Sequence, residues 1–202
     1  IFNSNQRHGI LYPPCSVDEY KNPLDNTRKN VIISFAQFRP EKDHKLQIEI
    51  LERLRSMGHN IKLEMIGSIR HEDDKNIVCD LERMIISKGL QDYVSIYINL
   101  PMIEIKDKFK SARFGLHTMK DEHFGIALIE MMSSGLILFA HNSAGPRFDI
   151  IGSSTLNSSN RVCGFLANDK EEFIDCISKA IQRPETYLAI QTNAREKVQE
   201  FS

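Results

Sequence analysis

Two glutamates, Glu122 and Glu130, stand eight residues apart across the expected start of a helix. Gly125 lies between them, and an apolar run at 114–117 precedes them. This order predicts a strand, a short loop and a helix, with Glu122 at the end of the loop and Glu130 two turns into the helix. A helix N-terminus binds phosphate through its unpaired N–H groups and partial positive charge. Because carboxylates bind hydroxyl groups, the pattern favours a nucleotide-sugar site, with Glu122 on the sugar and Glu130 on the ribose.

The same spacing also occurs by chance on many helices, where both glutamates are solvated surface charges. The helix predicted here is mostly apolar, which argues against that alternative. Its apolar residues are Phe124, Ile126, Leu128, Ile129, Met131 and Met132. A glutamate on a largely buried helix needs a partner or a ligand, so these surroundings support the binding-site interpretation more than the spacing alone does.

The bulk composition excludes several classes of protein. The chain has 202 residues, a formal net charge of −1 and 26% charged residues. This length supports one substantial core, and there is no basic excess that would indicate a nucleic-acid partner. No apolar run approaches the length of a membrane span. Four cysteines without metal-binding spacing predict reduced thiols in a cytosolic environment: Cys15, Cys79, Cys163 and Cys176.

Apolar runs alternate along the chain with segments of helical periodicity. Strands are predicted at 31–36, 61–66, 94–98, 113–118, 136–140 and 164–167. Helices are predicted at 43–57, 73–88 and 102–110, around Glu130, and at 170–182 and 184–200. Repeated strand-then-helix units predict the α/β class, with a Rossmann-like parallel sheet covered by helices on both faces. Ligands bind such sheets at the carboxyl ends of the strands.

This order divides the chain into three parts. Residues 1–30, punctuated by prolines, are predicted to be an interdomain linker, 31–182 a nucleotide-sugar-binding domain, and 183–202 a C-terminal helix. The chain begins with Ile1 rather than methionine, and no signal-peptide pattern follows. We therefore expect a piece of a longer protein, with a further domain or a membrane anchor before it.

The loops after the first two strands carry further candidates. Arg39 and Lys42 follow the first strand and are suited to a diphosphate, although a charged turn before a helix is the alternative. Gly67 ends the second strand and would allow a ligand close to the backbone. The acidic run 71–74 resembles a metal cluster, but acids at a helix start more often serve as caps and dipole charges.

The later loops carry weaker signals. His117 and Thr118 close the fourth strand; a strand-end histidine is usually structural, but this position also suits a substrate contact. The small-residue loop 141–146 either wraps a sugar or phosphate, or is simply a turn. No GxGxxG follows the first strand and no GxxxxGK[ST] loop is present, so a dinucleotide or P-loop site is not supported.

Taken together, these residues resemble the C-terminal, donor-binding half of the retaining glycosyltransferases of the GT-B fold. The Glu-x7-Glu element of that superfamily matches Glu122 and Glu130. A more specific resemblance, over residues 9–182, is to the eukaryotic GDP-mannose-dependent α-1,2-mannosyltransferases that extend the dolichol-linked oligosaccharide at the endoplasmic reticulum. Four motifs in order carry it: 37–44, 115–119, 122–126 and 140–146.

The resemblance implies a role for each matching residue. Glu130 would hold the ribose hydroxyls of GDP, and Lys42 would neutralise the leaving diphosphate. His117 would contact the transferred sugar. The mannose hydroxyls and the diphosphate would be bound by Glu122 together with the segment that follows it, which contains His123, Phe124, Gly125 and Ile126.

The sequence departs from the pattern at one phosphate-binding position. Many relatives carry arginine where this chain has Gln37, so Arg39, two residues on, would have to take that role. Successive strand residues alternate between faces, and Arg39 reaches the site only if the loop bends to bring it there.

The resemblance also implies the reaction. Mannose would pass from GDP-mannose, in α-1,2 linkage with retention, to Man3GlcNAc2 or Man4GlcNAc2 on dolichol diphosphate, without a metal ion or other cofactor. The lipid-linked acceptor would bind a preceding domain, and the enzyme would lie on the cytosolic face of the endoplasmic reticulum membrane. This chain alone would bind GDP weakly and transfer nothing. The alternatives are another nucleotide-sugar-dependent transferase or an epimerase of the same fold, or a non-catalytic sugar-nucleotide-binding module.

Overall fold

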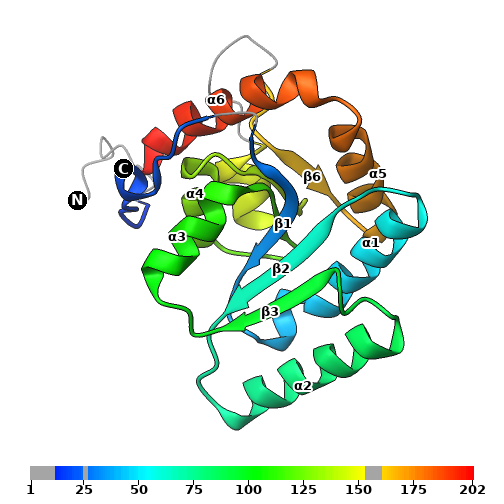
Figure 1. The fold of residues 1–202 in the computed structure, drawn as a ribbon. Helices are drawn as coiled ribbons and strands as arrows, with labels where there is room; N and C mark the ends of the chain where they lie inside the picture. Colours follow the sequence, from blue (N-terminus) through cyan, green and yellow to red (C-terminus); the bar gives the residue numbers. More distant parts are fainter. Residues whose placement is uncertain (1–11, 25–26, 153–160) are drawn as a thin grey trace, which may run out of the picture.

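The computed structural model describes residues 12–24, 27–152 and 161–202. Within these ranges six strands form one parallel sheet in the order β3-β2-β1-β4-β5-β6 (Figure 1). They are β1 (Lys29–Phe35), β2 (Lys62–Gly67), β3 (Val94–Ile98), β4 (Ala112–His117), β5 (Ile137–His141) and β6 (Phe165–Ala167). The predicted Rossmann-like parallel sheet is therefore confirmed, with strand boundaries close to those read from the apolar runs.

Helices cover both faces of the sheet, as predicted (Figure 1). One face packs against α1 (His44–Ser56), α2 (Glu72–Ser87) and α5 (Lys170–Ile181). The other packs against α3 (Met102–Ser111) and α4 (Ile126–Ser133). Helix α6 (Tyr187–Val198) contributes to both cores, Tyr187 and Ile190 to the first and Ala194 and Val198 to the second. All five residues of β5 are buried, as expected of a central parallel strand with helices above and below it.

The acidic run at 71–74 serves helix α2. The carboxylate of Asp74 accepts hydrogen bonds from the backbone N–H groups of Arg70 (2.8 Å) and His71 (3.3 Å), which caps the helix. These bonds hold the pKa of Asp74 below its usual value, chiefly through the Arg70 N–H. Among residues 12–24, 27–152 and 161–202, no group of three or more His, Cys, Asp or Glu side chains could hold a metal ion.

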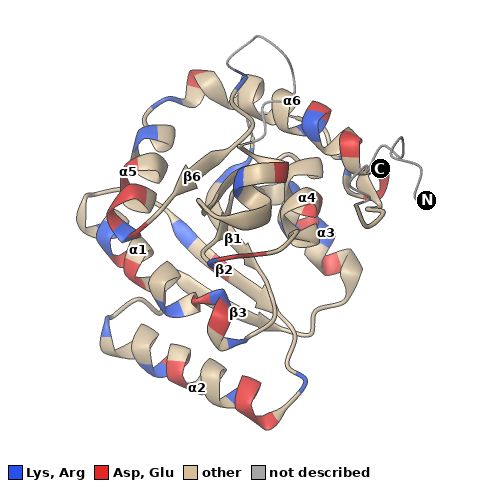
Figure 2. Ribbon diagram, turned by 180° about the vertical axis from the view of Figure 1, so that it is seen from behind, with Lys and Arg blue, Asp and Glu red and all other residues tan. Residues whose placement is uncertain are grey.

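Charges of both signs lie close together on the outer surface of the helices. Figure 2 shows basic and acidic residues interspersed along α1 and α2. On α2 they form local pairs, with Lys75 2.8 Å from Glu72 and Arg83 2.6 Å from Asp80. In the part of the chain that is described, no helix has the length and apolar character needed to cross a lipid bilayer.

The predicted linker packs against α4 where it is described. Residues 1–11 and 25–26 of the linker lie outside the described ranges. Its short 3-10 turn η1 (Val17–Tyr20) is held by Ser133 of α4, whose hydroxyl donates to the carbonyl of Val17 (2.5 Å). The N–H of Cys15 donates to the carbonyl of Phe201 (3.1 Å), so the linker and the C-terminal segment lie side by side (Figure 1). The three-part division of the chain stays a prediction.

Candidate functional site

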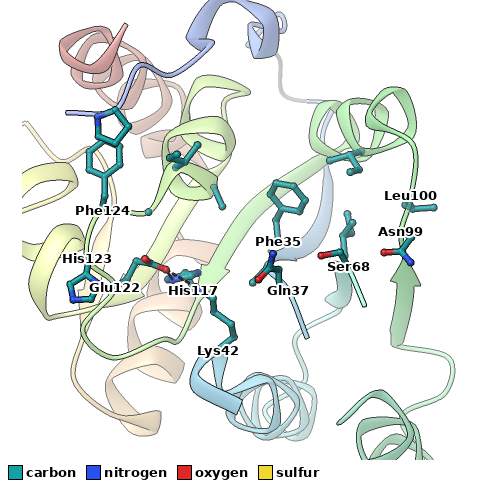
Figure 3. Close-up of a pocket in the computed structure, with 18 residues that line it drawn as sticks. Phe35, Gln37, Lys42, Ser68, Asn99, Leu100, His117, Glu122, His123 and Phe124 are labelled. Carbon is teal, nitrogen blue, oxygen red and sulfur yellow. Dashed lines mark hydrogen bonds and ion pairs between the residues drawn. The ribbon is translucent and has the colours of Figure 1, made fainter. Parts of the chain in front are cut away.

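A pocket of about 600 Å³ opens at the carboxyl ends of the strands. It lies where the strand order changes direction, between the loops that follow β1 and β4, which is the usual ligand crevice of such sheets. Its lining is apolar on one side and polar on the other (Figure 3). The apolar side includes Phe35, Ile66, Leu100 and Ile105, and the polar side includes Gln37, Lys42, Ser68, Asn99, His117 and Glu122.

The three residues predicted to act on the transferred sugar and the leaving diphosphate meet in one cluster. Nζ of Lys42 lies 2.7 Å from Oε2 of Glu122, and Nε2 of His117 lies 3.1 Å from the same oxygen (Figure 3). The side chains of Lys42 and Glu122 are 17% and 16% exposed, whereas His117 is 3% exposed. The carboxylate of Glu122 is therefore held by two donors from different loops, with little solvent around it.

These contacts set the charge of each group. Hydrogen bonds from His117 and Lys42 lower the pKa of Glu122 to about 2, so it is a carboxylate at neutral pH. Burial lowers the pKa of His117, although the hydrogen bond to Glu122 opposes this effect. A neutral His117 has one N–H, and that proton must be on Nε2 for the ring to donate to Glu122. The cluster then carries one positive and one negative charge.

Thr118 and Gln47 fix the backbone of Lys42 through a chain of two hydrogen bonds. The hydroxyl of Thr118, which is 1% exposed, donates to the carbonyl of Lys42 (2.8 Å). The amide Nε2 of Gln47 donates in turn to the hydroxyl oxygen of Thr118 (2.9 Å). Lys42 is the last residue of the turn η2 (Pro40–Lys42), so this buried pair ties the loop after β1 to the end of β4.

The loop 141–146 does not line the pocket; it supports the loop that does. The N–H of Gly145 donates to the carbonyl of Glu122 (2.8 Å), and the hydroxyl of Ser143 accepts from the N–H of Asp121 (2.8 Å). A Cβ at Gly145 would lie 3.0 Å or less from three carbonyl oxygens of residues 122–124. Only glycine allows this approach, so the motif at 140–146 fixes the backbone of the motif at 122–126.

The N-terminus of α4 faces the pocket. His123, Phe124, Gly125 and Ile126 all line it, as the resemblance implied. Gly125 is the N-cap residue with φ +91°, a conformation that favours glycine. The N–H of Leu128 already donates to the carbonyl of Gly125 (2.9 Å), so the N–H groups of Ile126 and Ala127, which precede it, are the ones available to an anion.

Glu130 lies one turn beyond the pocket wall. Ala127 lines the pocket but Glu130 does not, and its Oε1 accepts a hydrogen bond from the hydroxyl of Tyr20 (2.9 Å). Burial raises the pKa of Glu130, and the Tyr20 hydrogen bond partly opposes this. The sequence predicted Glu130 as a site residue but missed Tyr20, because the linker offers no local signal that it returns to α4.

Arg39 points away from the pocket. Its N–H donates to the carbonyl of Gln37 (2.9 Å), and the chain turns there into η2. The turn aims the guanidinium toward Glu41, 3.9 Å away, beside a separate surface depression. Gln37 faces the pocket instead, so the expected diphosphate contact of Arg39 is not supported.

Four further pocket residues come from strand ends. Gly67 lines the pocket, and a Cβ there would collide with the carbonyl oxygen of Ala36, so its role includes close packing of two strand ends. Gln37, Ser68 and Asn99 follow β1, β2 and β3 respectively, and none was predicted as a site residue. Their position after strands was the available signal, but polar residues at strand ends are too common to be specific.

Comparison with known proteins gives one family for this chain. Residues 5–197 match the family described as glycosyl transferases group 1. Two similar relatives, from Mus musculus and Homo sapiens, are each named GDP-Man:Man(3)GlcNAc(2)-PP-Dol alpha-1,2-mannosyltransferase. They are 37% and 38% identical over 203 residues, covering 96% of this chain. The chain spans only 40% of the length of either relative.

Solved structures share the fold at lower identity. The Anabaena protein HepE, in complex with UDP and glucose, superimposes with a TM-score of 0.75 at 17% identity, covering 95% of this chain and 52% of that one. TarM gives a TM-score of 0.74 at 19% identity, covering 90% of this chain and 34% of that one. These similarities support the fold alone. The family follows from the match over residues 5–197: the chain belongs to the glycosyl transferases group 1.

Proposed function

We propose that this chain is the donor-binding half of a retaining α-1,2-mannosyltransferase. In the whole enzyme it would use GDP-mannose to extend Man3GlcNAc2 and Man4GlcNAc2 on dolichol diphosphate, at the cytosolic face of the endoplasmic reticulum. The names of the relatives mention GDP-Man, Man(3)GlcNAc(2)-PP-Dol and the α-1,2 linkage, and the remaining parts of the proposal follow from the resemblance. The observation that carries the proposal is the Lys42–Glu122–His117 cluster, which lies in the same pocket as the N-terminus of α4.

The pocket offers a suitable partner for each part of the donor. The diphosphate would lie between Lys42 and the first N–H groups of α4, where positive charge is concentrated. The mannose would lie against Glu122 and His117, whose polar atoms suit hydroxyl groups. The ribose would point toward Glu130, and the guanine would enter the apolar side of the pocket near Leu100.

The chemistry follows from charge stabilisation on the departing GDP. The bond from the mannose C1 to the phosphate oxygen breaks, and a bond from C1 to the acceptor oxygen forms on the same face. The acceptor proton passes to the departing phosphate oxygen. Lys42 and the helix N–H groups stabilise the charge that develops there, each donor contributing roughly 3 kcal/mol. In this scheme Glu122 is a hydrogen-bond acceptor, because its two donors keep it an anion. The transfer proceeds without a covalent intermediate and without a metal ion.

Titration calorimetry with GDP, UDP and GDP-mannose tests the proposal. We expect GDP to bind at least about tenfold more tightly than UDP, a difference of about 1.4 kcal/mol, and Glu130→Ala to weaken GDP binding roughly tenfold through loss of the ribose contact. Equal or preferred UDP binding would assign the pocket to another sugar donor. Binding of neither nucleotide would contradict donor binding altogether. Because the acceptor would bind a preceding domain, mannose transfer by this chain alone would contradict the two-part mechanism.

A further inference from the structure

The hydroxyl of Tyr20 reaches Glu130 from the predicted linker. Tyr20 Oη lies 2.9 Å from Oε1 of Glu130, although 110 residues separate them in the chain. Tyr20 is 5% exposed, so this contact is shielded from solvent. Within the described ranges Oε2 of Glu130 accepts no hydrogen bond, and a carboxylate has lone pairs on both oxygens. The contact therefore fixes one oxygen of Glu130 and leaves the other available.

The turn that carries Tyr20 is itself held at both ends. The hydroxyl of Ser133 donates to the carbonyl of Val17 at its start, one helical turn beyond Glu130 on α4. At its end, the Tyr20 ring packs against Phe109 of α3, with the ring centroids 6.1 Å apart. Tyr20 is thus fixed between α3 and α4 before any ligand binds, and the hydroxyl position is set by its surroundings.

The surroundings also keep Tyr20 a hydrogen-bond donor. Burial and the neighbouring carboxylate raise its pKa well above the usual value, so the hydroxyl stays protonated at any working pH. Nζ of Lys106 lies 5.1 Å from the centroid of the Tyr20 ring, and its charge favours the ionised form of Glu130. Burial alone would favour a protonated Glu130. Tyr20 and Lys106 therefore counter that effect.

We infer that Tyr20 is a positioning residue for the nucleotide ribose, which it serves by orienting the carboxylate of Glu130. The inference rests on the proposed function, because it takes the ligand to be a ribonucleoside diphosphate. One oxygen of Glu130 is held by Tyr20, and the other oxygen accepts the ribose hydroxyls. The linker is then part of the donor site. Movement of Tyr20 would weaken binding of the ribose and leave the contacts of the diphosphate unchanged.

Comparison of GDP with 2′,3′-dideoxy-GDP isolates the ribose contact. Calorimetry on the wild-type chain is expected to show a preference for GDP of about tenfold or more, as for hydrogen bonds to a charged group. Tyr20→Phe keeps the ring and removes only the hydroxyl; it should reduce this preference to below about threefold, mainly by weakening GDP. Tyr187→Phe is the matched control, because Tyr187 is also buried and its hydroxyl donates to the carbonyl of Ile181, at 3.4 Å, away from the pocket lining. It should keep the wild-type preference.

A merely structural role for Tyr20 would weaken both nucleotides equally and leave their ratio unchanged, which would overturn the inference. In a Glu130→Gln background, Tyr20→Phe should have no further effect on the ratio, because the two residues act through one carboxylate. If UDP binds and GDP does not, the proposed donor is wrong, and the same ratio measured with UDP and 2′,3′-dideoxy-UDP still decides the role of Tyr20. Binding of none of these nucleotides would overturn both.

Discussion

Nζ of Lys42 and Oε2 of Glu122 are 2.7 Å apart across 80 residues of sequence. The contact joins the loop after β1 to the loop after β4, on the two sides of the point where the strand order reverses. Both side chains are largely buried, and His117 donates to the same carboxylate oxygen. The pocket therefore holds a balanced pair of charges before ligand binds, with the cation placed for a diphosphate and the anion for hydroxyl groups.

Replacing the cation should weaken nucleotide binding through the phosphates alone. Lys42→Met removes the charge while keeping most of the side-chain volume, and we expect the affinity for GDP to fall roughly tenfold. Guanosine, which has no phosphate, should be unaffected. Calorimetry in low and high salt provides a second check, because the variant should lose part of the salt dependence.

Lys45→Met is the control for this change. Lys45 is 61% exposed and lies three residues away on α1, 4.0 Å from Asp80. Its replacement should leave the affinity for GDP within about twofold of wild type, as expected of an exposed pair. An equal loss in both variants would indicate a general effect of surface charge rather than a contact with the diphosphate.

Replacing the anion should act on the sugar rather than on the nucleotide. Glu122→Gln keeps the shape of the side chain but removes the charge that accepts mannose hydroxyls and balances Lys42. We expect the affinity for GDP-mannose, divided by that for GDP, to fall roughly tenfold, while GDP itself binds no more weakly than to wild type. Parallel titrations with both ligands measure this ratio. A parallel loss for the two ligands would argue that Glu122 holds the loop and not the sugar.

Because Gly145 supports the backbone of residues 122–126, we expect this position to be sensitive to substitution. In Gly145→Ala the new Cβ would lie 2.6 Å from the carbonyl oxygen of His123 and 2.8 Å from that of Phe124. The loop must shift, so we expect a loss of about 1–3 kcal/mol in the free energy of unfolding together with loss of GDP binding. Urea denaturation and calorimetry measure the two effects.

Gly58→Ala is the control for Gly145→Ala, because it introduces backbone strain without displacing the loop at 122–126. Gly58 has φ +88°, but a Cβ added there would meet no atom within 4 Å, and the residue is not part of the pocket lining. Alanine there should cost about 1 kcal/mol of stability through backbone strain and leave GDP binding intact. Normal GDP binding by Gly145→Ala would show that the loop 141–146 does not position the site.

The lowered pKa of His44 predicts how the stability of the fold depends on pH. Burial, with smaller contributions from His117 and Lys42, lowers the pKa of His44 from 6.5 to about 4, so the folded protein holds it neutral. Between these values the unfolded chain binds the proton and the folded chain does not. Stability therefore falls as pH decreases from 6.5 to about 4, by roughly 3 kcal/mol from this group.

Urea denaturation across that pH range tests this expectation. His117 contributes in the same direction, since burial also lowers its pKa, whereas Glu122 contributes stability above about pH 4.5 that is lost only as pH falls toward 2. His44→Leu should reduce the slope between pH 6.5 and 4.5 but leave the part due to His117. An unchanged slope in this variant would rule out His44 as the main source.

The fold was readable from sequence because buried parallel strands are continuous apolar runs. The strand β5 is buried throughout and the helices that flank the strands have clear apolar faces, so local patterns and the final structure agree. The sequence singled out Lys42, His117 and Glu122 for a related reason, because each lies at or after the carboxyl end of a strand that forms the crevice. All three line the pocket, and their roles stay predictions.

Other site residues depend on packing between distant segments. Tyr20 lies in a linker without periodicity, and its partner Glu130 is 110 residues away, so no local pattern indicates the contact. Arg39 was predicted from its charge, but the tight turn between Gln37 and η2 directs it elsewhere. In both cases the path of the backbone decides where the side chain lies, and the residue type alone does not specify that path.

The most direct test of donor binding in this pocket is a crystal structure of the chain with GDP-mannose bound. We expect the diphosphate between Lys42 and the N-terminus of α4, the mannose against Glu122 and His117, and the ribose hydroxyls within hydrogen-bond distance of Glu130. A nucleotide bound outside the crevice between β1 and β4, or bound there with its diphosphate away from Lys42, would contradict the proposed site.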